Sequence, residues 1–107
     1  LDTHDKRLIE RIFQSQSSHI YIYGAGQKGR RLARYLQTEA PEISLVGMID
    51  RFPQMTVFNG VQVSSTLPRL KDEVIVVASF AYADEIVEQL MQSSVPLNKI
   101  IAICNRV

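Results

Sequence analysis

The stretch HIYIYGAGQKG, residues 19–29, decides the fold of this 107-residue chain. Its first half is rich in β-branched and aromatic residues, which predicts a strand over 19–23. GAGQKG matches the G-x-G-x-x-G pattern directly after a strand and at the start of a helix, the context that a dinucleotide-binding turn requires. Gly24 permits a tight turn, Gly26 leaves room for a pyrophosphate, and Gly29 lets helix and strand approach closely. Free N–H groups and the helix dipole then favour an anion at this turn.

Outward from the turn, strands and helices alternate. Helical spacing of apolar residues predicts a helix ending near Glu39, and ISLVGMID (43–50) and VIVVA (74–78) predict two further strands. A helix over 81–92 and a closing strand over 100–103 complete the predicted elements. Such alternation requires parallel strands with right-handed crossovers. We therefore predict an α/β fold, a small doubly wound parallel sheet of Rossmann type, with strand 19–23 between the other two.

The connections between these elements carry weaker patterns. Residues 51–59 contain Pro53 and no periodicity, which predicts a surface loop that folds over a ligand. The pattern over residues 61–63 predicts at most a short extended segment. Pro68 marks a short helix or turn over 66–70.

An extra helix precedes the first strand. Thr3 is the predicted N-cap of a helix over 4–16, and Leu8, Ile12 and Phe13 are predicted to be buried against the sheet or against a second copy in a homodimer. We divide the chain into this N-terminal helix (1–17) and a Rossmann-like nucleotide-binding domain (18–107). We expect the whole to be a fragment of a longer protein that carries a catalytic domain.

Composition excludes several classes of partner. Twelve basic and eleven acidic residues give a formal charge of +1, too little for bulk attraction to nucleic acid. No apolar run is long enough to insert directly into a membrane. The single cysteine, Cys104, forms no intramolecular disulfide and predicts a reducing, cytoplasmic location.

Three segments are predicted to converge on the ligand, because the carboxyl ends of parallel strands share one edge of the sheet. Asp50 is placed to accept hydrogen bonds from a ribose diol. Arg51 either meets a ribose 2′-phosphate, stacks on adenine or is an exposed loop residue. Ser79 either lines the pocket or caps the following helix. The predicted cofactor-binding residues are Gly24, Ala25, Gly26, Gln27, Lys28, Gly29, Asp50, Arg51 and Ser79.

The sequence leaves the role of the basic side chains open and offers no candidate for a catalytic residue. The basic group Lys28, Arg30, Arg31 and Arg34 either contacts phosphate or forms a solvated helix face, and Lys28 is the one nearest the turn. His4 and His19 are far apart in the predicted fold and lack partners, so we predict no metal site. No Tyr-x-x-x-Lys is present, and we predict no catalytic residue.

Longer stretches resemble accessory domains of bacterial carbohydrate enzymes. IYIYGAGQKGRRLARYL (20–36), LVGMIDRFPQ (45–54) and NGVQV (59–63) are similar to the nucleotide- or coenzyme-A-binding-like domain of nucleotide-sugar dehydratases and epimerases of polysaccharide biosynthesis. YGAGQKG, MIDRFP and SFAYADEI also resemble the C-terminal domain of sugar methyltransferases. Either resemblance implies a module that holds NAD(P), a nucleotide-sugar or another nucleotide while chemistry occurs elsewhere.

Three functions remain open from the sequence. The first is a nucleotide-binding module of a larger enzyme. The second, a complete redox enzyme, is disfavoured because the chain is too short for a substrate lobe and offers no positioned proton donor. The third is a structural or dimerisation domain whose glycine turn is kept only for packing.

Overall fold

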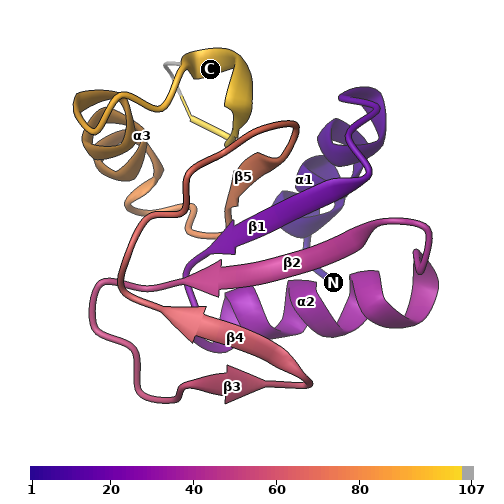
Figure 1. Cartoon of the computed structure of the whole chain (residues 1–107). Helices are drawn as coiled ribbons and strands as arrows, with labels where there is room; N and C mark the ends of the chain where they lie inside the picture. Colours follow the sequence, from indigo (N-terminus) through magenta and orange to yellow (C-terminus); the bar gives the residue numbers. More distant parts are fainter. Residues whose placement is uncertain (105–107) are drawn as a thin grey trace.

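Strand β1 (His19–Tyr23) lies inside a six-stranded sheet with the order β3-β4-β2-β1-β5-β6 (Figure 1). The computed structural model describes residues 1–104, so the last residues of the predicted domain, 105–107, lie outside it. The other described elements are α1 (Thr3–Gln14), α2 (Gln27–Glu39), β2 (Ser44–Ile49), β3 (Val57–Phe58), β4 (Val61–Ser64), β5 (Val74–Val77), α3 (Ala83–Gln92), a 3₁₀ turn (Leu97–Lys99) and β6 (Ile100–Ile101).

The sheet is mostly parallel. β1 pairs in parallel with β2 on one side and with β5 on the other, as the sequence predicts. β2 also pairs in parallel with β4, and β5 with β6. Among the described strands, only β3 runs antiparallel, as a hairpin with β4. The chain therefore has a mixed α/β fold in which each parallel strand ends at the same edge.

Helices cover both faces of this sheet. Ile20 and Ile22 of β1 belong to a core cluster that also contains residues of α1 and α2. Tyr21 and Tyr23, which alternate with them, contact the second cluster, which contains Val87 and other residues of α3. All four residues of β5 are buried, as expected for a central parallel strand.

Two short strands extend the sheet where the sequence pattern predicts a loop and a brief extended piece. β3 lies within the predicted loop 51–59, and β4 is a full strand whose Val63 pairs with Met48 of β2. Asn59 and Gly60, both at positive φ, form the two-residue turn between them. β4 forms because the outer edge of β2 supplies its hydrogen-bond partners, and β4 in turn supplies those of β3. Residues 66–70 form bends and irregular structure, with no helix.

The N-terminal helix differs from the prediction at both ends. Asp2 is the N-cap in place of Thr3, and its carboxylate accepts the Asp5 N–H at 2.8 Å. The helix ends at Gln14. Leu8 and Ile12 are fully buried, as predicted, whereas Phe13 is 49% exposed. Leu8 and Ile12 share a face at i and i+4, but Phe13 is rotated by about 100° from Ile12 and points away from the sheet.

Within residues 1–104, none of the helices has the length and apolar character needed to cross a membrane.

Candidate functional site

The glycine turn joins the end of β1 to the start of α2, and its backbone requires two of its glycines. Gly24 has φ +112°, a conformation that favours glycine, and its N–H donates to the Ile49 carbonyl at 2.7 Å. A Cβ on Gly29 would overlap the carbonyl group of Gly24. The first turn of α2 therefore packs directly on the strand end.

Gly26 has a different role because the space around it is open. It is the N-cap of α2, with φ −78° and ψ −167°, and no side chain caps the helix. A Cβ on Gly26 would have no atom within 4 Å. The N–H groups of the first turn have no acceptor within the helix, so they are available to an anionic ligand.

Three adjacent pockets meet at this turn. The largest, of about 500 Å³, lies between the loops that follow β2 and β5. A second, of about 430 Å³, lies over the glycine turn itself. A third, of about 210 Å³, lies beside Asp50 and Gly26. Every residue of the predicted cofactor-binding set lines at least one of these pockets, so the fold brings together all of the residues selected from the sequence.

Aromatic side chains surround the turn. Phe52 follows β2 and is 80% exposed, while Phe80 and Tyr82 follow β5 and are 61% and 65% exposed. Phe52 and Tyr82 line the largest pocket, and Phe80 lines the pocket over the turn. Exposed rings of this kind offer flat faces for stacking a planar base. Phe52 was not selected from the sequence as a ligand-binding residue. Its position just after the end of a strand was the one sequence feature that could have indicated such a role.

Asp50 braces the glycine turn. One carboxylate oxygen accepts the Ala25 N–H at 2.8 Å and the other accepts the Phe52 N–H at 3.0 Å. The Ala25 N–H is thus already paired and is not free for a phosphate. Each oxygen retains a further lone pair, so a hydrogen bond from a ribose hydroxyl to Asp50 stays a prediction.

We expect the change Asp50→Ala to destabilise the free protein by about 1.5 kcal/mol, because two backbone N–H groups lose a charged acceptor. Urea unfolding followed by circular dichroism measures the effect. Asp72→Ala is the matched control at an exposed position and should change the stability by less than about 0.5 kcal/mol. Equal stabilities of the two variants would show that Asp50 does not brace the turn.

The cations near the turn have different environments. The Lys28 ammonium pairs with carboxylates of α1 and its cap, at 3.2 Å from Asp2 and 3.7 Å from Asp5. Phosphate contact by Lys28 therefore stays a prediction, and such contact would compete with these pairs. Arg30, which the sequence placed only within a basic group, lines the pocket beside Asp50. Arg51 lines the largest pocket, where its guanidinium lies 5.7 Å from the Phe52 ring centroid.

Ser79 and Tyr23 also line the largest pocket, together with Glu85, Ile86 and Gln89 of α3. The Ser79 hydroxyl accepts the Tyr82 N–H at 3.1 Å, and α3 begins only at Ala83 with Tyr82 as its N-cap. The alternative prediction of Ser79 as helix N-cap is thus wrong, because the loop after β5 is two residues longer than the pattern suggested. Burial raises the pKa of the Tyr23 hydroxyl, whose neighbours Arg51 and Asp50 act in opposite directions. Tyr23 therefore remains a neutral hydrogen-bond donor.

The fold and the site together define an α/β protein whose mostly parallel sheet carries a glycine turn and three pockets at its carboxyl edge. Residues 16–101 match the family model described as C2185-like, N-terminal, and the chain belongs to this family. The match includes the glycine turn and the five parallel strands among the described residues, but α1 precedes it. None of the curated proteins matches the chain.

Proposed function

We propose that this domain binds a nucleotide-type ligand, with a phosphate over Gly26 at the start of α2 and a base between the loops after β2 and β5. The observation that carries the proposal is the convergence of three segments, the glycine turn and the loops after β2 and β5, on an uncapped helix start. The turn supplies unpaired N–H groups and open space, and exposed rings such as Phe52 and Tyr82 supply stacking surfaces.

We further propose that the sheet is a doubly wound arrangement of Rossmann type. The chain runs from β1 outward to β2 and then crosses to β5 on the other side of β1. In such sheets the reversal of strand order opens a crevice at the carboxyl ends, and ligands bind there. The glycine turn lies at the end of β1, between the ends of β2 and β5, which supports the proposal.

The ligand is sought with a panel of NAD, NADP, coenzyme A, S-adenosylmethionine and UDP-sugars. We expect one member to raise the unfolding free energy, by about 2.7 kcal/mol at one hundred times its Kd. Thermal unfolding detects this shift, and isothermal titration calorimetry then measures the affinity. Absence of saturable binding by every member would reject the proposal and favour a structural domain.

We also propose that chemistry occurs in another domain of a cytoplasmic carbohydrate-modifying enzyme, either a nucleotide-sugar dehydratase or epimerase or a sugar methyltransferase. The support is the resemblance of the glycine turn and of the segments around Asp50 and Ser79 to accessory domains of those enzymes. Homodimerisation through α1 has less support. Of the three apolar residues of α1 that were predicted to be buried, Leu8 and Ile12 are already buried within the domain, and Phe13 alone is exposed.

A further inference from the structure

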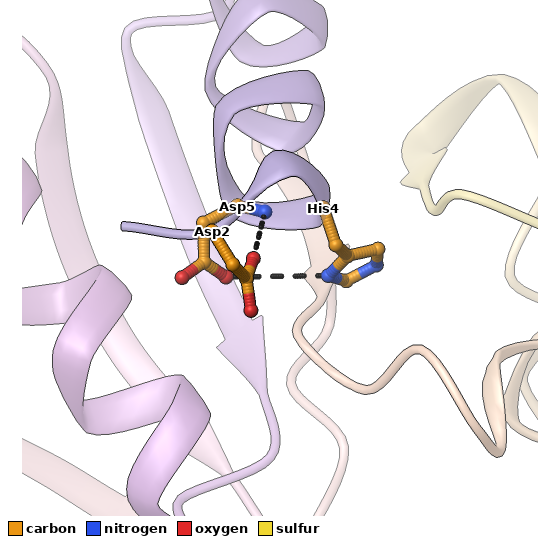
Figure 2. A group of neighbouring side chains, drawn as sticks. All are labelled: Asp2, His4 and Asp5. Carbon is orange, nitrogen blue, oxygen red and sulfur yellow. Dashed lines mark hydrogen bonds and ion pairs between the residues drawn. The ribbon is translucent and has the colours of Figure 1, made fainter.

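We propose that Asp2, His4 and Asp5 form a binding site for a divalent transition-metal ion of the Zn²⁺ or Co²⁺ type. These residues lie at the start of α1, and their ligand atoms lie within 4.8 Å of one another. The sequence pattern placed His4 without partners, but the helix brings it beside two carboxylates (Figure 2). None of these three residues lines a proposed nucleotide pocket, although they contact Lys28 and Phe80, which line the pocket over the glycine turn.

Buried polar atoms without hydrogen-bond partners support a metal site here. The side chain of His4 is 8% exposed and that of Asp5 is fully buried. Both ring nitrogens of His4 and one carboxylate oxygen of Asp5 have no hydrogen-bond partner among the described residues. Burying such atoms unpaired is costly. The ring of His4 is held edge-on against Phe80, with centroids 5.1 Å apart.

The spacing of these atoms suits a metal ion. His4 Nδ1 lies 4.0 Å from Asp5 Oδ1, too far for a hydrogen bond (Figure 2). Zinc binds imidazole nitrogen and carboxylate oxygen at about 2.0 to 2.2 Å each, so a metal between the two atoms requires them to close to about 3.4 Å for tetrahedral geometry. Asp2 is 53% exposed on its side chain, which leaves one side of the site open to water.

Two cations compete with a metal for the same carboxylates. The Lys28 ammonium lies between Asp2 and Asp5 Oδ1, whereas Arg31 pairs with Asp2 and with the other oxygen of Asp5, at 2.8 Å. A metal must therefore displace Lys28, a residue that also lines the pocket over the glycine turn. Arg31 can remain paired with Asp5 Oδ2, because the metal would bind Oδ1.

Because Lys28 competes with the metal for Asp2 and Asp5, the variant Lys28→Met gives the most specific test of the proposal. Co²⁺ is titrated into the chain in a Cys104→Ser background, with visible absorption as the readout and Zn²⁺ as the competitor. We expect one equivalent to bind. His4→Gln should weaken binding about tenfold or more, and Lys28→Met should tighten it several-fold. The matched control is His19→Gln, which removes the other histidine of the chain and should leave the affinity unchanged.

Histidine NMR provides a readout that does not depend on the fold of a variant. On addition of Zn²⁺ to the wild-type chain, the ring nitrogen signals of His4 should shift, while those of His19 should not. The proposal is overturned if no saturable binding occurs at millimolar metal or if the His19 signals alone shift. It is equally overturned if His4→Gln, folded by circular dichroism, binds as wild type does, or if Lys28→Met fails to tighten binding.

Discussion

Replacing Gly29 by alanine is expected to destabilise the folded chain by about 3 kcal/mol or more. The added Cβ would overlap the carbonyl group of Gly24 and would lie 3.6 Å from Ile22. Helix propensity alone has the opposite sign, since alanine is favoured over glycine by about 1 kcal/mol within a helix. The overlap is with backbone and forces α2 away from β1, so packing outweighs propensity. Urea unfolding measures the loss.

Gly26→Ser is the matched control for Gly29→Ala. A Cβ added to Gly26 would meet open space, and the backbone there is extended, a conformation that serine adopts readily. Serine is also a good N-cap, so the stability should stay within about 0.5 kcal/mol of wild type or rise. A Gly29→Ala variant as stable as wild type would mean that α2 does not need to contact the end of β1 so closely.

The variant Gly26→Val is expected to lose nucleotide binding by about one hundredfold or more, which corresponds to about 2.7 kcal/mol. Its branched side chain would occupy the space directly over the uncapped start of α2, where we place the phosphate. The measurement is the Kd, by calorimetry, of whichever panel ligand binds the wild-type chain.

Stability of the same variant separates binding from folding. Valine is a poorer N-cap than glycine, but its side chain has no neighbours to displace, so the unfolding free energy should change by no more than about 1 kcal/mol. Gly26→Ser should give an intermediate loss of affinity, because its smaller side chain competes for the same N–H groups. Wild-type affinity in Gly26→Val would place the phosphate elsewhere.

Much of the fold could be read from local patterns. Three local patterns predicted β1, β5 and the start of α2: the β-branched and aromatic run over 19–23, the apolar run at 74–78 and the glycine turn between strand and helix. The central place of β1 was expected from the strand order of Rossmann-type sheets, in which the strand before the glycine turn lies inside the sheet. Asn59-Gly60 also carried a hairpin signal, but the strands on each side are too short for periodicity to detect.

The candidate site was also predicted only in part from the sequence. That Gly24, Asp50 and Ser79 would meet at one edge followed from parallel topology. The partners of individual side chains did not follow from it. Asp50 accepts an N–H from Ala25, and the carboxylates beside α1 pair with Lys28 and Arg31 of α2. These contacts join residues 25 or more positions apart in the sequence.

The sequence by itself determined the longer helices and strands and the position of the glycine turn, because backbone geometry and side-chain periodicity act over a few neighbouring residues. Only the tertiary structure decided that α1 packs against α2 through charged pairs, that His4 is buried beside two carboxylates, and that Phe13 faces solvent. Those outcomes depend on distances between segments remote in sequence, and both burial and electrostatic attraction are set by such distances.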